Sequence, residues 1–312
     1  MAGETYDLIV VGSGLTGASA AYACAVRGYR VLVLERRGTA GRPEEVDLAA
    51  VGFEDLVPSG SQALRPVEKL ALVTGGRRDE REWAGLLVRR GTLRREYLAG
   101  AEAEGGELWL GCRRIDLRTE GEVVVSGSGG ERVVSGRFIL GADGAVSAVG
   151  RAAGVRHRRF LATAWVRASL KGRLTAPEIH LGPAYPGGWA WLFPWEKEVW
   201  AGVAMEGRPG ETLAFFLAAT GGLLRRGGDC AVRTGILPGA EGLPAAAGRI
   251  LLAGDAAAGG PGRRTDFGVA SGRLAGGMVA AALAEGMDVA RLAQGYAARL
   301  ERLADPAAIW QK

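Results

Sequence analysis

Three glycines near the start of the chain have the spacing of a phosphate-binding turn. Gly12, Gly14 and Gly17 form a G-x-G-x-x-G pattern within YDLIVVGSGLTGASAAYACAVRGYRVLVLE, residues 6–35. The first glycine permits a tight turn, the second lets a phosphate approach the backbone, and the third lets a helix pack close to a strand. Glu35 follows at the distance at which a carboxylate accepts the ribose hydroxyls of an adenine dinucleotide. The pattern therefore predicts dinucleotide binding.

The elements expected around these glycines agree with that chemistry. The apolar run 6–11 is typical of a buried parallel strand, the alanine-rich stretch 15–28 favours a helix, and 30–34 is a second strand. Leu15 and Thr16 begin the helix, where unpaired N–H groups and the positive end of the dipole favour a pyrophosphate. Arg36 lies just beyond the acid. From this stretch alone, NAD and FAD are both candidates.

Two later turns place an acid directly after an apolar strand. Asp143 and Gly144 follow a strand expected over 137–140, and Gly254 and Asp255 follow one expected over 249–253. An Asp-Gly pair is also a common surface turn. Because both turns follow strands in a chain that already has a dinucleotide pattern, we expect them to reach the same ligand.

A long helix is expected from residue 265 to about 285, with Gly268 and Val269 in its first turn. Small residues recur along it at three- and four-residue spacing, at Gly272, Ala275 and Gly276. Small side chains on one helix face predict very close packing against another backbone or against a cofactor. A last helix is expected over 288–304.

Aromatic residues gather in the second half of the chain. Trp189, Trp191 and Phe193 alternate along one expected strand and therefore share one face, with Pro194 next to them. Residues 200–205, which include Gly202, form the expected partner strand. Such a stripe has two interpretations, a packed core or a binding surface.

The expected fold class is α/β, with a Rossmann-like dinucleotide-binding domain and a smaller antiparallel-sheet domain. Short strands over 107–134 predict a β-meander inserted in the first domain, and the segment 36–82 is expected to be irregular. We assign 1–155 and 244–312 to the first domain. Residues 156–243, together with part of 40–85, form the expected substrate domain.

Composition limits the classes of function. The 312 residues are 48% hydrophobic and 23% charged, which predicts a folded protein with a real core. Cys24, Cys112 and Cys230 lie far apart in the sequence and are odd in number, so we expect them to be reduced thiols. Neither histidine has a cysteine or histidine nearby that could share a metal ion with it, so no metal is expected. The net charge of +5 comes from arginines scattered along the chain, which does not favour nucleic-acid binding. It leaves attraction to an anionic membrane or a diphosphate as an alternative.

No export signal is visible, so a cytoplasmic location, with or without peripheral membrane contact, is expected.

Three motifs, which we call the phosphate-loop motifs, lie at residues 12–17, 143–144 and 254–255. Taken in order, they resemble those of the p-hydroxybenzoate-hydroxylase-like flavoproteins, and among these the FAD-dependent geranylgeranyl reductase family. That family has a Y-x-W-x-F-P motif followed by G-x-G. Here Trp189 leads the first part and Gly202 begins the second, with Ala204 in place of the last glycine. The resemblance implies FAD as cofactor and an isoprenoid chain as substrate, whose double bonds are reduced by hydride transfer. It also implies an electron donor, either NADPH or ferredoxin.

The resemblance implies particular roles for residues. Gly12, Gly14 and Gly17 would hold the FAD pyrophosphate and Glu35 the ribose. Arg90 matches the family's R-x-x-F/L motif and would contact the flavin, and Asp255 would bind the ribityl and pyrophosphate region. The remaining implied contacts are Asp143 and Gly144 to the pyrophosphate or a nicotinamide donor, the N–H groups of Gly268 and Val269 to the flavin ring, and Trp189, Trp191 and Phe193 to an apolar chain. No side chain is assigned as a catalytic acid or base.

The sequence also departs from that family. The cysteine-and-glycine element beyond the ribose acid has no counterpart, and the loop between Asp255 and Thr265 is one residue longer. The aromatic motif also resembles the G-W-x-W-x-I-P motif of flavin halogenases, which need a lysine near the flavin; Lys69 is the early candidate. A flavin monooxygenase or halogenase acting on an aromatic substrate is therefore one alternative. A non-catalytic or electron-carrying FAD protein is another.

Overall fold

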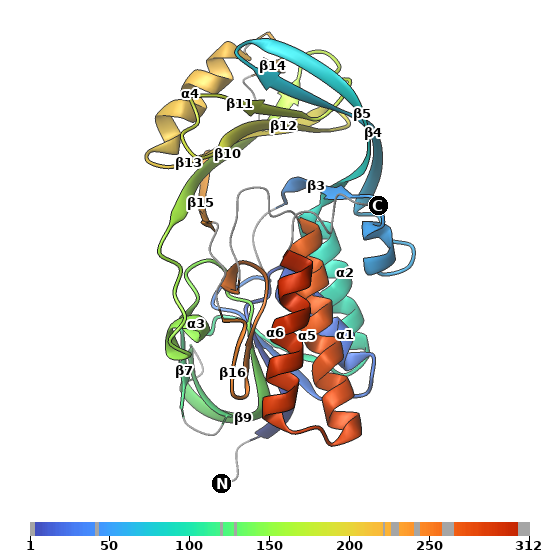
Figure 1. The fold of residues 1–312 in the computed structure, drawn as a ribbon, viewed down its shortest axis with the longest axis vertical. Coiled ribbons are helices and arrows are strands. Elements are labelled where there is room, and N and C mark those ends of the chain that lie inside the picture. The colour runs from blue at the N-terminus through green and yellow to red at the C-terminus, as the bar shows by residue number, and fades with distance from the viewer. Residues whose placement is uncertain are drawn as a thin grey trace.

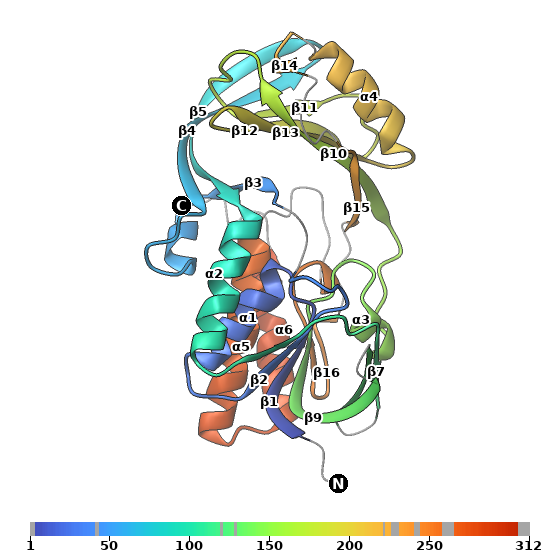
Figure 2. The same cartoon turned by 180° about the vertical axis from the view of Figure 1, so that it is seen from behind.

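The computed structural model describes residues 4–40, 44–118, 121–127, 130–220, 222–225, 231–239, 244–257 and 265–304. These residues form two sheets, one above the other, with helices packed beside the first sheet and another helix over the outer face of the second (Figures 1 and 2). Cys230 and most of the loop between Asp255 and Thr265 lie outside the described residues.

The first sheet has a parallel centre in the order β17-β9-β1-β2-β6. Its apolar strands are buried on both sides, as parallel strands are. The expected α/β fold class is confirmed. The bounds of this sheet are β1 (Glu4–Val11), β2 (Val31–Leu34), β6 (Glu107–Trp109), β9 (Gly130–Gly141), β17 (Ile250–Leu252) and, antiparallel at the edge, β16 (Ala246–Ala247).

A meander of β7 (Arg114–Leu117), β8 (Glu122–Gly127) and β9 continues from this sheet. Two details differ from the expectation. Residues 107–110 do not belong to the meander, because β6 pairs in parallel with β2. Residues 132–134 and 137–140 are not two strands, because β9 runs unbroken, pairing first with β8 and then with β1 and β17.

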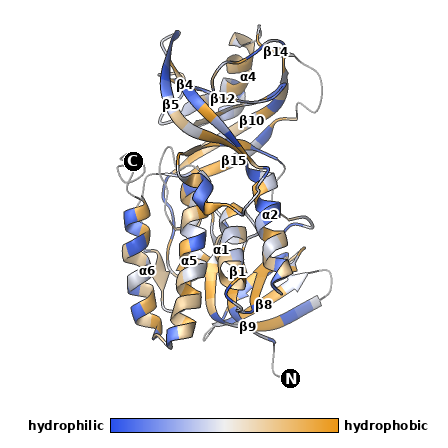
Figure 3. Cartoon of the chain, turned by 90° about the vertical axis from the view of Figure 1, so that its right-hand side faces the viewer, coloured by the Kyte–Doolittle hydropathy of each residue, from blue (hydrophilic) through white to orange (hydrophobic). Residues whose placement is uncertain are grey.

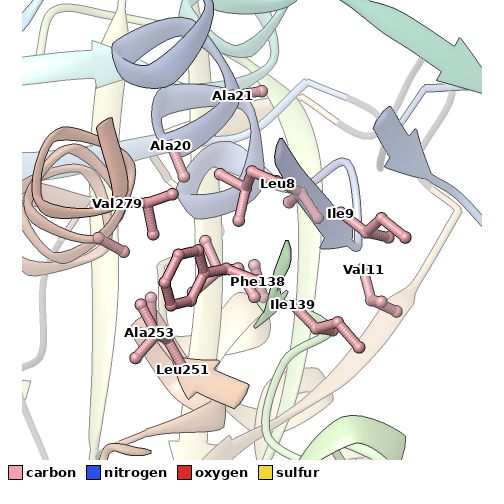
Figure 4. Close-up of a cluster of buried hydrophobic side chains, with 14 of the residues drawn as sticks. Leu8, Ile9, Val11, Ala20, Ala21, Phe138, Ile139, Leu251, Ala253 and Val279 are labelled. Carbon is pink, nitrogen blue, oxygen red and sulfur yellow. The ribbon is translucent and has the colours of Figure 1, made fainter. Parts of the chain in front are cut away.

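Helices cover one side of the first sheet (Figures 1 and 2). Their bounds are α1 (Leu15–Ala25), α2 (Arg90–Ala103), α5 (Thr265–Glu285) and α6 (Val289–Ala304), and the short α3 (Ala148–Ala152) lies near β7. The core between helices and sheet is formed by strand residues such as Leu8, Phe138 and Leu251, which meet Ala20 of α1 and Val279 of α5 (Figure 4). All five are at most 4% exposed.

Glycines let α5 press directly on the backbone of α1. A Cβ atom built on Gly272 would lie 2.2 Å from the carbonyl oxygen of Thr16, and one on Gly276 would lie 2.1 Å from that of Ala20. The stripe of small residues therefore serves helix packing. By length and apolarity α5 could span a membrane, and half of its most apolar 18-residue window is buried inside the protein.

The second sheet has the order β14-β10-β13-β12-β11-β4-β5-β3, with β15 also paired to β10. Its pairings are antiparallel except for the parallel pair of β11 and β4. The bounds are β3 (Val46–Ala50), β4 (Leu64–Thr74), β5 (Arg77–Arg89), β10 (Phe160–Leu170), β11 (Glu178–Leu181), β12 (Trp189–Trp195), β13 (Glu198–Met205), β14 (Leu224–Arg225) and β15 (Arg233–Pro238).

The long hairpin of β4 and β5 corrects the expectation of an irregular segment over 36–82. Its two-residue turn consists of Gly75 and Gly76, with φ of 59° and 78°. Positive φ at both positions is the type I′ geometry that matches the twist of a hairpin. The tip of the hairpin is hydrophilic (Figure 3), with arginines and acids in RRDERE over 77–82. These charged residues interrupt the alternation of apolar and polar residues by which a strand is recognised, because neither face of this end of the hairpin has to be apolar.

The chain therefore passes between the two sheets four times. Residues 46–89 belong to the second sheet, 90–141 return to the first, 160–238 form the rest of the second, and 246–304 return again. Helix α4 (Pro209–Ala219) packs on the outer face of the second sheet. Two 3-10 turns complete the described structure, η1 (Phe53–Leu56) and η3 (Gly254–Ala256).

Candidate functional site

A cavity of about 1140 Å³ lies between the two sheets. It is larger than the roughly 300–1,000 Å³ typical of small-molecule pockets. Its first half is formed by the loops after β1, β9 and β17, and its second half by the inner face of the second sheet. The three phosphate-loop motifs thus converge on one space. The expected site residues that line it are Gly12, Gly14, Leu15, Thr16, Glu35, Arg36, Arg90, Asp143, Gly144, Asp255, Gly268, Trp189, Trp191 and Phe193.

The glycines after β1 divide into one whose Cβ position is open and two whose Cβ positions are blocked by backbone atoms. A Cβ atom on Gly14 would have no protein atom within 4 Å. Gly12 has φ of 104°, and a Cβ atom built on it would lie 2.5 Å from the carbonyl oxygen of Ala142. A Cβ on Gly17 would lie 1.9 Å from the carbonyl oxygen of Gly12. Gly17 is consequently a packing residue, and the open side of the turn is at Gly14.

Glu35 is held in place at the end of β2. Its carboxylate accepts hydrogen bonds from the backbone N–H of Ser13 at 3.1 Å, from the Ser13 hydroxyl at 2.7 Å and from the N–H of Arg37 at 2.8 Å. Glu35 is 8% exposed and still lines the cavity. Three donors fix the orientation of the carboxylate and leave lone pairs that can accept from a ribose.

Asp143 uses its carboxylate to begin α3. It accepts from the hydroxyl of Ser147 at 2.5 Å and from the N–H groups of Ala148 at 2.6 Å and Val149 at 3.3 Å. Burial raises the pKa of this carboxyl, although these hydrogen bonds act against the shift. Asp143 therefore shapes the loop, and the adjacent Gly144, with φ of 87° and open space at its Cβ position, faces the cavity.

Arg90 begins α2 at the junction of the two halves. Its Nη1 lies 3.2 Å from Oε2 of Glu45 and 4.0 Å from Oδ2 of Asp47. Asp47 also accepts from the hydroxyl of Thr265 at 2.8 Å, which ties β3 to the start of α5. The charge of Arg90 is thus shared between two carboxylates that line the same cavity.

Aromatic side chains form the wall of the second half. Trp165, Phe193 and Trp200 are at most 7% exposed and belong to one apolar cluster, against which Trp191 packs. The rings of Trp191 and Phe193 stack with centroids 6.2 Å apart. The indole N–H of Trp200 donates to the carbonyl oxygen of Glu44 at 3.2 Å, which joins this wall to the loop before β3. The stripe is both core and cavity wall, because its buried members support rings that reach the cavity.

Five expected residues do not line the cavity: Gly17, Gly254, Val269, Pro194 and Gly202. Gly254 donates its N–H to the hydroxyl of Ser271 at 3.0 Å, and Val269 is fully buried among the helices. Pro194 neighbours Phe193 on β12 and so faces the other side of the sheet.

Gly202 has a role that differs from the expected substrate contact. It pairs with Trp191 on one side and Trp165 on the other. A Cβ at this position would lie 2.3 Å from the Trp191 ring and 2.7 Å from Cβ of Trp165. The glycine therefore makes room for the tryptophan ring to lie across β13.

Other lining residues were missed from the sequence, among them Trp83, Trp165 and Arg94. Trp83 lies on the hairpin of β4 and β5, which the sequence did not predict. Trp165 faces the cavity because of its pairing with Gly202, and no local sequence pattern indicates that pairing. Arg94 follows Arg90 by one helical turn, which was a usable signal. Lys69 is a surface residue of β4, 3.4 Å from Glu80, and no lysine lines the cavity within the described ranges.

Comparisons with known proteins agree with this geometry. Residues 7–45 match the family described as FAD dependent oxidoreductase. A digeranylgeranylglycerophospholipid reductase of Methanopyrus kandleri is 31% identical over 65% of this chain, and one of Thermoplasma volcanium is 26% identical over 61%. This chain is thus similar in sequence to part of two digeranylgeranylglycerophospholipid reductases. The matches cover 58% and 54% of those two proteins, so the chain spans little more than half of their length.

Solved structures show the same fold. A geranylgeranyl bacteriochlorophyll reductase-like protein of Thermoplasma acidophilum superposes with a TM-score of 0.81 at 20% identity, covering 96% of this chain and 84% of that one. A probable FAD-dependent monooxygenase of Pseudomonas aeruginosa has a TM-score of 0.77 at 18% identity, with 98% and 94% covered. The same fold is therefore found in a reductase-like protein and in a probable monooxygenase.

The residues that line the cavity fit FAD, the cofactor named by the family match. The open face of Gly14 admits a phosphate to the backbone, and Glu35 is oriented for a ribose. Gly268 lines the cavity at the start of α5, so its helix end can face a flavin. Bound there, FAD would supply hydride chemistry.

Proposed function

We propose that the protein is an FAD-dependent oxidoreductase that reduces carbon–carbon double bonds of an isoprenoid chain. The observation that carries the proposal is the continuity of the cavity. One end has the features of a dinucleotide cradle, and the other is walled by Trp165, Trp189, Trp191 and Phe193. A polyprenyl chain has only apolar surface to offer, and such a wall binds it by excluding water.

The protein's own contribution would be orientation and exclusion of water. The wall has a fixed shape because the Trp191 ring stacks on Phe193 and lies directly over the backbone of Gly202. A rigid apolar wall can hold a double bond beside the flavin position without a charged side chain touching the chain. The names of the relatives support the same class of substrate, since they reduce geranylgeranyl groups of a glycerophospholipid by name.

An anaerobic experiment tests the proposal. Protein loaded with FAD is reduced chemically, mixed with geranylgeranyl substrates, and followed by the return of the oxidised flavin spectrum. Reoxidation by a geranylgeranyl compound, with a product two mass units heavier per reduced bond, is the expected result. A flavin that stays reduced across a series of prenyl chain lengths would contradict the reductase proposal.

The electron donor forms a second part of the proposal. NADPH and reduced ferredoxin are the two candidates, and each is mixed anaerobically with the oxidised FAD-loaded protein. Bleaching of the flavin identifies the donor. Failure of both would exclude them without affecting the test of substrate.

The monooxygenase alternative has the support of fold alone. A halogenase is disfavoured by the position of Lys69, whose ammonium pairs with Glu80 on the surface. The reduced protein should therefore not consume oxygen faster when aromatic compounds are added. Oxygen uptake that rises with an aromatic substrate would favour the alternative.

A further inference from the structure

Two arginines of α2 line the cavity, and they differ in whether a carboxylate pairs with their charge. Arg90 is paired with Glu45 and Asp47. Arg94, one turn further along the helix, is 7% exposed, and its Nε is buried without a hydrogen-bond partner among the described residues. Arginine keeps its charge in proteins, so Arg94 is a buried cation.

The two carboxylates that act electrostatically on Arg94, those of Glu44 and Glu45, are already engaged with other groups. Glu44 accepts from the N–H of Gly91 at 2.6 Å and from the hydroxyl of Thr92 at 2.8 Å, and it lies 3.5 Å from Arg95. Glu45 pairs with Arg90. Leaving a buried charge unpaired is expensive in free energy. The position of Arg94 in the cavity lining therefore calls for an anionic partner that the described part of the chain does not supply.

The position of Arg94 indicates which anion this is. Helix α2 packs along α1, with Leu93 in the same buried cluster as Leu15 and Ala18. Arg94 is thus level with the first turns of α1, where the open face of Gly14 and the helix N-terminus favour a phosphate. Glu35 and Arg36, at the adenosine end, line the same cavity.

We propose that Arg94 binds the diphosphate of the dinucleotide cofactor. The inference rests on the proposed use of FAD and assigns a residue that the glycine motif does not include. The diphosphate carries the negative charge that neutralises the guanidinium. Arg90 then remains free to hold its two carboxylates at the junction of the cavity halves.

Binding measurements on the apo-protein test the inference without catalysis. Arg94→Met keeps the apolar length of the side chain and removes its charge. Affinity for FAD and for ADP should fall by about 10- to 100-fold, as expected for a lost charge-assisted hydrogen bond. Riboflavin, which has no phosphate, should bind equally to both proteins. The matched control is Arg95→Met on the same helix, because the Arg95 side chain is 61% exposed; it should bind both ligands as the wild type does.

Thermal unfolding separates this role from a merely structural one. Without ligand, Arg94→Met should unfold at the wild-type temperature or higher, because an unpaired buried charge is removed. With saturating FAD its gain in melting temperature should be smaller than that of the wild type. A variant that melts several degrees lower without ligand, yet binds FAD and ADP within twofold of wild type, overturns the inference. If that variant does not fold, Arg94→Lys gives the same comparison with a smaller expected loss.

Geranylgeranyl diphosphate distinguishes the cofactor from a diphosphate substrate. If Arg94→Met loses affinity for this compound but not for ADP, the site belongs to the substrate and the inference is overturned. A wild-type protein that binds neither FAD nor ADP overturns it as well. A protein that binds FAD through Arg94 but reduces no prenyl chain would instead refute the proposed function and leave the inference standing.

Discussion

Replacement of Gly14 by alanine should separate folding from cofactor binding. The backbone there has φ of −62° and ψ of 175°, which any residue adopts, and a Cβ atom would meet no protein atom within 4 Å. Without ligand, the variant should be as stable as wild type or about 0.4–1 kcal/mol more stable, because alanine restricts the unfolded chain. The new methyl group would occupy the approach of the pyrophosphate to the backbone.

The expected loss is in FAD affinity. Displacing the phosphate from one backbone N–H removes a charge-assisted hydrogen bond of about 1.5–3 kcal/mol. Since each 1.4 kcal/mol corresponds to about tenfold in affinity, the dissociation constant should rise by about 10- to 100-fold. Quenching of flavin fluorescence on titration of apo-protein measures the affinity, and urea unfolding of the same preparation measures stability.

The neighbouring glycines supply the contrast. Alanine at Gly12 would force a residue with φ of 104° within 2.5 Å of a carbonyl oxygen, and alanine at Gly17 would lie 1.9 Å from another. Each should lower the stability of the apo-protein by about 1–3 kcal/mol. Wild-type FAD affinity in Gly14→Ala, or a loss of apo-stability equal to that of the other two variants, would refute the division of roles.

Three further outcomes follow from the structure. Gly202→Ala should displace the Trp191 ring and slow prenyl reduction severalfold while FAD affinity stays unchanged; loss of FAD binding would contradict this. Burial raises the pKa of Asp143 above its ordinary 3.8, so the stability gained from its protonated form is present below that pH and declines as the pH rises through the folded-state pKa. The stability difference between wild type and Asp143→Asn should therefore fall with rising pH in urea unfolding from pH 3 to 8, and a difference that grows would count against it. Burial raises the pKa of the Cys24 thiol to about 12, so at pH 8 a maleimide should label it only as fast as the protein unfolds, with the other cysteines replaced by serine. Rapid labelling of the folded protein would show the thiol to be accessible.

The nucleotide half of the fold could be predicted because local signals coincide there. An apolar strand, three spaced glycines, an alanine-rich helix and Glu35 all lie within 30 consecutive residues. Local propensity and the tertiary structure agree in this stretch, so the prediction from sequence matched the fold found in the structure.

The second sheet could be predicted only in part, because its strands come from distant parts of the chain. Strand β11 pairs in parallel with β4, about a hundred residues earlier, and no local pattern carries that information. The hairpin of β4 and β5 has charged residues of both signs on both faces at its tip, which obscures its period, although Gly75 and Gly76 are a type I′ turn signal. The site was incomplete for the same reason. Gly202 looked like a ligand contact until its neighbours on both sides proved to be tryptophans.

The fourfold passage of the chain between the two sheets also bears on how such proteins can diversify. A single exchange of sequence at one junction cannot transplant the tryptophan wall, because that wall needs both 46–89 and 160–238. Moving this wall to another protein would therefore require both segments to be exchanged together. The hydrogen bond from Trp200 to Glu44 links the two segments at the place where such an exchange would have to be coordinated.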